Sequence, residues 1–428
     1  MGPYDVPSSP APSTIDVGWL IDGTGATPRS RCRLLVADGR IRRVTGWDDS
    51  EPLPPERGAG HLDFSHATLL PGLIDAHLHL VFSGTADPEV RRRQLDYDDS
   101  AARSVIQGHI DALARAGVVA VRDGGDHHGH TLRCWLASGE TWPVRVRTAG
   151  RAWHAPGRYG RLIGRPPEPV RSLAESIRRD HSPIHHVKIV ASGLNSLEAF
   201  GKTTPPQFSA AELAGAVRTS TSMGRGVMVH ANGPEPVAQA VTAGCQSVEH
   251  GFFMGREALG RMADSSTVWV PTAVTMRGYA EAGGDSRPDR SRREMARRNL
   301  DHQLDQIRQA TELGVRIALG TDAGTLGVHH GDSVRAELGL LMAGGLSVEA
   351  AAHAATAVGA DLLGLSDLGR IAPGMAAVLV AVPGPPSDLP GSLAHPVVIR
   401  LDADRVGKYG GQTTRRPDPS ARPDAGGR

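Results

Sequence analysis

From residue 69 onward, short apolar runs alternate with stretches whose apolar residues recur every three or four positions. A strand buried on both faces appears as a continuous apolar run, whereas a helix lying on a sheet is apolar along one side only. Strand-like runs occupy residues 69–76, 118–122, 144–148, 187–191, 226–230, 247–250, 268–271 and 316–320, and helical patterns include residues 101–116, 209–222, 234–243 and 293–313. This alternation predicts a parallel sheet built from strand–helix repeats.

Eight repeats over ~250 residues predict an α/β fold of the (β/α)₈ TIM-like barrel type. The alternative is an open, doubly wound sheet, which often carries a glycine fingerprint after its first strand. No such fingerprint follows residue 76, and polar residues gather at the C-terminal ends of the strands. Both observations favour the barrel, whose active site is built from those strand ends.

The segments on either side of the barrel consist of short β-like runs separated by turns. Between residues 14 and 68, the pair Asp38-Gly39 separates two such runs, which is a strong β-hairpin signal. After helical stretches at 333–343 and 347–363, β-like runs return at 377–382 and 397–401. We therefore predict a barrel over residues 69–369, a small composite β-sandwich from residues 14–68 and 370–412, and disordered ends at residues 1–13 and 413–428.

The composition limits the partners and the compartment. With 47 basic and 46 acidic residues, the net charge of +1 favours neither nucleic acid nor a membrane as a partner, and no apolar window could cross a bilayer. The mean hydropathy of −0.25 is typical of a soluble globular protein. No signal segment is recognised, and Cys32, Cys134 and Cys245 form neither a disulfide framework nor a metal clip. We expect a cytoplasmic protein that acts on a small molecule, with a homo-oligomer left open.

Six ionisable residues lie at or just after the ends of five predicted strands: His77, His79, Lys188, His230, His250 and Asp322. Residues two apart on a strand point to the same side, so the first two imidazoles should project together. Each of the six alone has an ordinary structural explanation, such as a core histidine or a helix N-cap. Together they indicate a site for divalent metal ions.

Lys188 makes this site more specific. An ammonium group beside a metal cation would be repelled, so the lysine must be neutral or chemically altered. Reaction with carbon dioxide would give a carbamate, N6-carboxylysine, which is anionic and can bridge two ions. A two-metal site then follows, with ions ~3.5–4 Å apart and a shared, acidified water.

The chain resembles the amidohydrolase superfamily, specifically the imidazolonepropionase-like branch that includes metal-dependent prolidases (Xaa-Pro dipeptidases). The resemblance rests on an ordered set of motifs: Ile21-Asp-Gly-Thr-Gly, Asp38-Gly-Arg-Ile, Leu70-Pro-Gly-Leu-Ile-Asp-Ala-His-Leu-His, Val121-Arg-Asp-Gly-Gly, Val187-Lys-Ile, Val229-His-Ala, Val248-Glu-His-Gly, Gly320-Thr-Asp-Ala-Gly and Gly369-Arg-Ile-Ala-Pro-Gly. It implies two zinc-like ions, one held by His77, His79 and Asp322 and the other by His230 and His250. Carbamylated Lys188 would bridge them.

The resulting expectation is an amide hydrolase. A metal-bridging hydroxide would attack a carbonyl, while Asp322 accepts the proton and passes it to the leaving amine. We favour an N-acyl amino acid or an Xaa-Pro-type dipeptide as the substrate. Phosphotriester or carbamate hydrolysis at the same centre is an alternative, and a barrel without catalytic activity is disfavoured because all six residues are present.

A mononuclear cyclic-amide hydrolase or deaminase is a further alternative. In that branch the resemblance implies a Glu or Gln two or three residues after the strand-five histidine. Here Asn232 and Gly233 occupy those positions, and a glutamate follows only at Glu235. This departure and the presence of Lys188 both favour the dinuclear amide hydrolase.

Residues that contact the substrate are harder to identify from sequence. Arg158, Arg277 and Tyr279 lie on predicted strand-end loops, where they could bind a carboxylate. His154 lies near the place of a Gly-Gly-His-like turn of the family, but the surrounding sequence departs from that pattern. The remaining histidine clusters, His127, His128 and His130 and the pair His329 and His330, are interpreted as loop residues, and Ala377 replaces a usual Asp in the small domain.

Overall fold

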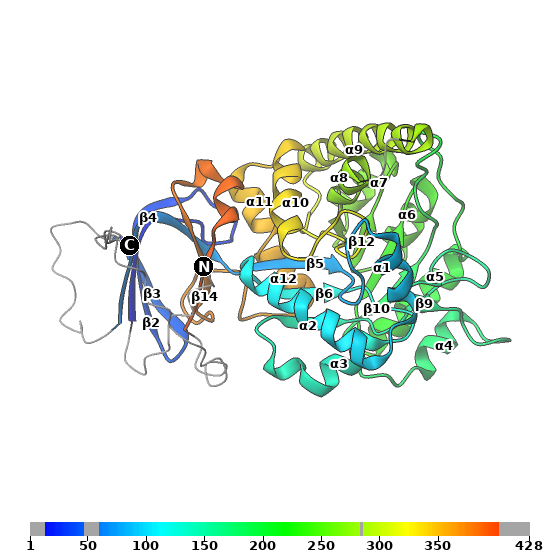
Figure 1. Cartoon of the computed structure of the whole chain (residues 1–428), viewed down its shortest axis with the longest axis horizontal. Helices are drawn as coiled ribbons and strands as arrows, with labels where there is room; N and C mark the ends of the chain where they lie inside the picture. The colour runs from blue at the N-terminus through cyan, green and yellow to red at the C-terminus, as the bar shows by residue number, and fades with distance from the viewer. Residues whose placement is uncertain (1–12, 47–59, 283–285, 402–428) are drawn as a thin grey trace, which may run out of the picture.

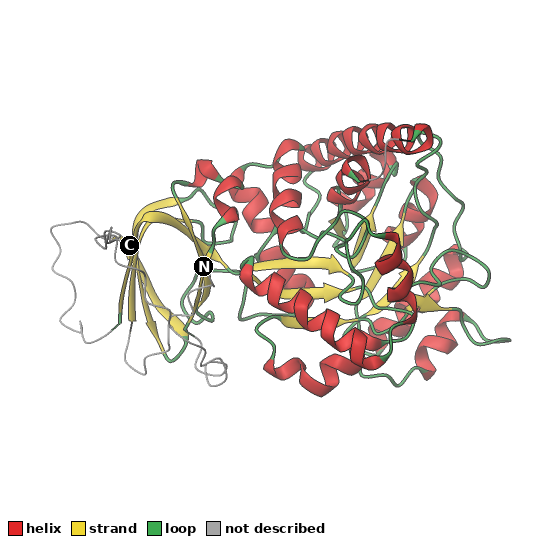
Figure 2. Ribbon diagram, in the orientation of Figure 1, coloured by secondary structure: helices red, strands yellow, loops and turns green. Residues whose placement is uncertain are grey.

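The computed structural model describes residues 13–46, 60–282 and 286–401 (Figure 1). A twisted sheet made by the first and last described segments lies beside a larger body in which helices surround parallel strands (Figure 2). The predicted leader (except Ser13), the predicted tail and residues 402–412 of the predicted β-sandwich lie outside the described residues. The domain boundaries at residues 69 and 369 stay a prediction.

The small sheet combines strands from both ends of the described chain. Its order is β15-β14-β4-β1-β2-β3, with bounds Val397–Arg400, Val378–Pro383, His61–Pro71, Ser13–Leu20, Arg29–Ala37 and Arg40–Gly46. Asp38 and Gly39 have φ values of 53° and 69°, as a type I′ hairpin turn requires, so the predicted hairpin is confirmed. The Ile41 N–H donates to the Met375 carbonyl (2.9 Å), and the sheet therefore folds back on itself around an apolar core.

The larger body contains the parallel strands of the barrel. In chain order these are β5 (Leu73–Leu78), β6 (Val118–Asp123), β7 (Arg145–Thr148), β8 (Ala152–Trp153), β9 (Gly164–Arg165), β10 (Val187–Val190), β11 (Val227–Ala231), β12 (Ser247–His250) and β13 (Val268–Val270). The third barrel strand is split: β7 pairs with β6, and after a short bend β8 pairs with β10. The chain therefore passes from one group of strands to the next without leaving the barrel wall.

The eighth predicted strand, residues 316–320, is not a regular strand in the structure. Its backbone nevertheless bonds to both neighbours, because Ala318 N–H donates to the Trp269 carbonyl and Ala76 N–H to the Leu319 carbonyl, each at 2.9 Å. The chain turns at Asp322, whose φ is 56°, and pairing with the end of β5 continues at Ala323, whose carbonyl accepts the His79 N–H (2.9 Å). The segment thus joins β13 to β5 and completes the predicted (β/α)₈ arrangement.

Helices cover the outside of the barrel strands (Figure 2). Those described are α1 (Pro88–Arg93), α2 (Asp99–Arg115), α3 (His130–Ser138), α4 (Leu173–Arg179), α5 (Ala210–Ser222), α6 (Pro234–Thr242), α7 (Gly255–Ala263), α8 (Val274–Glu281), α9 (Arg287–Leu313), α10 (Asp332–Ala343), α11 (Val348–Ala354) and α12 (Ala357–Leu363). Capping boxes begin two of them, with Ser172 and Glu175 at α4 and Ser209 and Glu212 at α5. Among the described helices, none has the length and apolar character of a bilayer span.

Two helices differ from the sequence prediction. Helix α9 begins at Arg287, six residues earlier than predicted, where the Ser286 hydroxyl accepts the Asp289 N–H as an N-cap. The predicted helix 347–363 is two helices, because the carbonyls of Ala354 and Ala355 accept hydrogen bonds from Leu319 and Ile74 of the barrel wall. Those carbonyls are then unavailable to a continuous helix.

Candidate active site

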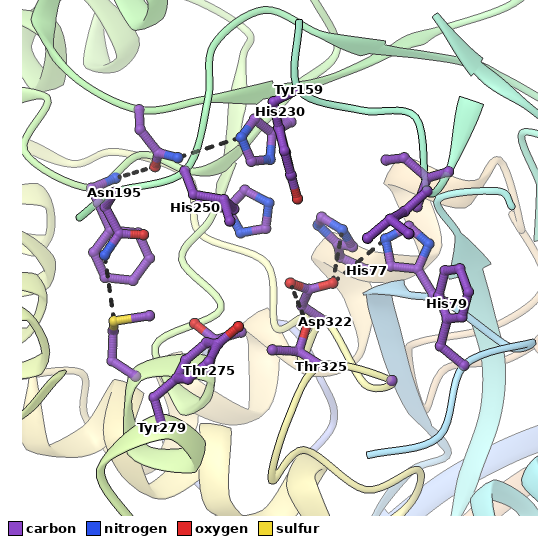
Figure 3. A pocket seen from close by; sticks show the side chains of 18 of the residues that line it. His77, His79, Tyr159, Asn195, His230, His250, Thr275, Tyr279, Asp322 and Thr325 are labelled. Carbon is purple, nitrogen blue, oxygen red and sulfur yellow. Dashed lines mark hydrogen bonds and ion pairs between the residues drawn. The ribbon is translucent and has the colours of Figure 1, made fainter. Parts of the chain in front are cut away.

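All six predicted metal-binding residues line one cavity of about 320 Å³ at the C-terminal ends of the barrel strands. Figure 3 labels the four histidines and Asp322. Side chains of Tyr159, Asn195, Thr275, Tyr279 and Thr325 complete the labelled part of the wall. The ligand-type atoms of His77, His250 and Asp322 lie within 4.8 Å of one another. The strand-end pattern in the sequence therefore corresponds to a single place in the fold.

His77 and His79, at the end of β5, point toward the same carboxylate. Their Nε2 atoms lie 3.6 and 3.5 Å from Oδ1 of Asp322. The other ring nitrogen of each is already engaged, since Nδ1 of His77 contacts Glu249 Oε2 (2.8 Å) and Nδ1 of His79 contacts the Gly125 carbonyl (2.7 Å). Both acceptors take a proton from Nδ1, which leaves Nε2 with a lone pair facing the cavity.

On β12, His250 also has a hydrogen-bond partner at Nδ1, here a hydroxyl that can donate or accept. Its Nδ1 contacts the Thr272 hydroxyl at 2.7 Å, and its ring centroid lies 4.9 Å from that of His77. His250, Thr272 and Asp322 have φ values of 68°, 48° and 56°, a left-handed conformation that costs free energy in residues other than glycine. Three such residues at adjoining strand ends show that the backbone is strained where it presents these side chains.

His230, on β11, is oriented differently. Its Nε2, rather than its Nδ1, lies 3.1 Å from a backbone carbonyl, that of Gly193. The Asn232 amide donates to the same carbonyl (3.2 Å). Because Nε2 faces this carbonyl, Nδ1 is the nitrogen of His230 left for a ligand in the cavity. The ring centroids of His230 and His250 are 4.6 Å apart.

Lys188 is buried, and its Nζ makes no hydrogen bond with any described residue. Burial lowers the pKa of Lys188 to about 8, because removal from water disfavours the ammonium form. Burial likewise raises the pKa of Asp322 to about 7, although the nearby lysine partly opposes this shift. Both shifts result from the removal of the two side chains from bulk water.

Two buried charged residues behind the histidines were not identified from the sequence. Glu249 accepts hydrogen bonds from Nη2 of Arg122 (2.9 Å), from His77 and from the Ser247 hydroxyl. Arg122 also donates from Nε to the Ala76 carbonyl (2.9 Å), next to His77 in the chain. The available signal was a charged residue within an apolar strand, at Val121-Arg-Asp and at Val248-Glu-His.

Of the four residues predicted to contact substrate, Tyr279 lines the cavity, whereas Arg158, Arg277 and His154 are not among its lining residues. Arg277 is exposed and pairs with Glu281 (2.8 Å), its neighbour one helical turn away. Arg158 donates to the Pro205 carbonyl (3.2 Å), and Nδ1 of His154 faces the adjacent Ala155 carbonyl (2.9 Å). Strand-end position alone could not give these side-chain directions.

The residues present fit divalent metal. Nε2 of His77 and Nζ of Lys188 are buried without a hydrogen-bond partner among the described residues, which is costly unless a ligand satisfies them. Hydrogen bonds from the second ring nitrogen are the usual support of histidine ligands. The donor set of imidazole nitrogens and a carboxylate suits zinc and similar ions.

Comparisons with known proteins agree with this geometry. The Amidohydrolase family profile matches residues 68–406. An uncharacterized protein of Mycobacterium tuberculosis is 26% identical over 389 residues, covering 89% of this chain and 94% of that protein. The imidazolonepropionase of Cereibacter sphaeroides is 28% identical over 402 residues (85% and 90% covered). The crystal structure of a Xaa-Pro dipeptidase with bound methionine superimposes with a TM-score of 0.75 at 27% identity, covering 91% of this chain and 98% of that one. The chain belongs to the Amidohydrolase family and is a hydrolase of carbon–nitrogen bonds.

Proposed function

We propose that this protein is a dinuclear metal-dependent hydrolase that cleaves the amide bond of an N-acyl amino acid or an Xaa-Pro-type dipeptide. The observation that carries the proposal is the convergence of four histidines, Lys188 and Asp322 on one cavity. Likeness to the Xaa-Pro dipeptidase supports the substrate class. We expect two Zn²⁺ ions. One would be held by His77, His79 and Asp322, and the other by His230 and His250.

Lys188 would bridge the two ions as a carbamate. A buried amine without a hydrogen-bond partner is a suitable precursor, because the neutral amine is the form that adds to carbon dioxide. The added carboxylate supplies the negative charge that four neutral imidazoles cannot. In this position an unmodified ammonium would oppose metal binding.

Bound metal supplies a water of lowered pKa and polarisation of the substrate carbonyl. Asp322 would be the group that moves the proton. Its Oδ1 faces the two β5 histidines, while Oδ2 accepts the Thr325 hydroxyl at 3.1 Å, which fixes the direction of the carboxylate. Asp322 would take the proton from the attacking water and give it to the leaving nitrogen, so that water and amide yield a carboxylic acid and an amine.

The mononuclear deaminase alternative depends on a proton-shuttling glutamate. Glu235 is exposed on α6, and its Oε1 accepts a hydrogen bond from Gln239 (3.3 Å). It does not line the cavity, so this geometry favours the dinuclear amide hydrolase.

We also propose a cytoplasmic location. The proposal is supported by the three cysteines, which are all free and buried, as expected in a reducing compartment.

The deciding measurement is metal content by elemental analysis, on the wild type and on Lys188→Ala, purified without chelator. We expect close to two ions per chain in the wild type, fewer in the variant, and hydrolysis of dipeptides or N-acyl amino acids by the wild type alone. One ion in both proteins would instead favour the mononuclear alternative. Two ions and full activity in Lys188→Ala would exclude the carbamate bridge.

A further inference from the structure

Arg91 adds a positive charge to the wall of the cavity, where a cationic side chain would not help to bind a metal cation. Among the residues that line the cavity, the cations are Lys188 and Arg91. Lys188 lies at the floor among the histidines, whereas Arg91 comes from the short helix α1 (Pro88–Arg93), in the segment that follows β5. The guanidinium of Arg91 would repel a metal ion. We therefore expect its partner to be an anionic group of a ligand bound in the cavity.

The guanidinium of Arg91 is held in place but carries no counter-charge. Its Nη1 donates to the carbonyls of Ser83 (3.1 Å) and Thr85 (3.5 Å). No carboxylate of the described residues forms an ion pair with it, whereas its neighbour Arg92 pairs with Glu89 (2.8 Å) on the exposed side of the helix. A guanidinium fixed by backbone carbonyls and left with free N–H groups is suited to bind a carboxylate.

Tyr279 connects this cation with the proposed catalytic group. Burial raises the pKa of the Tyr279 phenol, the charge of Asp322 raises it further, and the charge of Arg91 lowers it. All three side chains line the same cavity, so a substrate bound at Asp322 can extend along the wall to Arg91.

The rim of the same cavity is apolar and open to solvent. Leu162 and Leu194 are each 51% exposed, Leu95 is 40% exposed, and all three line the cavity. Large apolar side chains left exposed around a polar site mark a surface that a ligand covers. Met276, Phe82 and other apolar residues continue this surface inward.

We propose that Arg91 binds the carboxylate of the substrate and that the apolar rim receives a large apolar group beside the scissile amide. The substrate class is then N-acyl amino acids and dipeptides that have a free carboxylate and a bulky apolar side chain. This inference rests on the proposed function and assigns its specificity to residues that no strand-end argument selects.

The test compares each of two substrates, N-acetyl-L-phenylalanine and leucyl-proline, with its C-terminal carboxamide. For the wild type we expect kcat/KM about 10–100-fold higher with the carboxylate, in keeping with a charge-assisted hydrogen bond. Arg91→Met should lose this preference through a higher KM with little change in kcat. Arg92→Met, on the same helix but exposed and paired with Glu89, should keep it. N-acetylglycine should be a poorer substrate than N-acetyl-L-phenylalanine.

Binding measured by calorimetry to metal-loaded Asp322→Asn separates this inference from the proposed function. One outcome is that the carboxylate binds more tightly than the carboxamide, that Arg91→Met loses this difference, and that the wild type shows no turnover. This outcome would support the carboxylate site and overturn amide hydrolysis. Turnover without a carboxylate preference, or a preference that survives Arg91→Met, would overturn the inference alone. Absence of both turnover and binding would overturn both.

Discussion

At the residue scale, the arrangement behind His77 explains why its cavity-facing nitrogen is free. A carboxylate can only accept hydrogen bonds, so Glu249 requires the proton of His77 to sit on Nδ1. Arg122 pairs with Glu249 at 2.9 Å and supplies a counter-charge to it in a fully buried position. The three side chains act as one unit, and His77 cannot be oriented independently of the other two.

Glu249→Gln should therefore weaken metal binding although Glu249 is not itself a proposed ligand. The amide offers one acceptor where the carboxylate offers two, so either His77 or Arg122 loses its partner. We expect a loss of metal affinity of about 10–100-fold, the usual effect of removing a partner of a histidine ligand. Competition with a chelator measures it, with Glu257→Gln as control because Glu257 forms only an exposed pair with Arg261. Equal affinity in the two variants would show that Glu249 does not orient His77.

At the scale of elements, the sequence predicted what depends on local pattern and missed what depends on tertiary contact. Apolar runs predicted seven of the eight barrel strands, and turn chemistry predicted the Asp38-Gly39 hairpin. The rule for barrel strand ends selected the six ionisable residues. The break between α11 and α12 could not be predicted, because it results from hydrogen bonds to distant barrel residues. Arg91 was missed for the same reason: α1 has no apolar pattern, and only the path of the chain brings it to the cavity.

The closing segment at residues 316–323 gives an element-scale prediction. A Cβ on Gly320 would lie 2.4 Å from Val270 Cγ1 and 2.9 Å from His77 Cβ, so the segment could not keep its place between β13 and β5. We expect Gly320→Ala to destabilise the fold by about 1–3 kcal/mol through overpacking, and to lose metal as His77 is displaced. Denaturant unfolding and metal analysis measure both effects.

The matched control is Gly108→Ala, in the middle of α2, where a new Cβ meets no atom within 4 Å. Alanine is the better helix former, so this variant should gain up to about 1 kcal/mol and keep its metal. If Gly320→Ala were as stable as the wild type, the close packing of the eighth segment would not matter for the barrel.

At the scale of the whole molecule, the buried titratable groups divide into two sets with opposite effects on stability. Burial raises the pKa of Asp75, Asp123 and Asp322 to about 7 and of Glu337 to about 8. Burial lowers the pKa of the cavity histidines, among them His79 to about 4 and His230 to about 3. The stability of the metal-free protein should therefore depend on pH through both sets.

The pH dependence of unfolding of the metal-free protein follows from these shifts. Between pH 4 and 6.5 the unfolded histidines bind protons that the folded ones do not, which makes stability rise with pH and opposes the effect of the carboxyl groups. Above pH 6.5 the histidines no longer contribute. The folded carboxyl groups still hold protons that the unfolded chain has lost, so stability should fall from pH 6.5 to about 8, each group adding up to about 1.4 kcal/mol per pH unit. Lys188, whose pKa burial lowers to about 8, opposes this fall at higher pH, because the unfolded chain keeps a proton that the folded lysine has lost.

Thermal unfolding of chelator-treated protein across this range measures the effect, and Glu337→Gln isolates one contribution. Glu337 accepts the N–H groups of Ala273 and Val274 at the start of α8, away from the proposed ligands. Its stabilising contribution is complete below pH ~4.5 and is lost as the pH rises through its folded value of about 8. The Tm deficit of Glu337→Gln should therefore shrink with rising pH, because glutamine does not titrate. A constant deficit from pH 5 to 8.5 would mean that Glu337 is ionised throughout and that burial does not set its pKa.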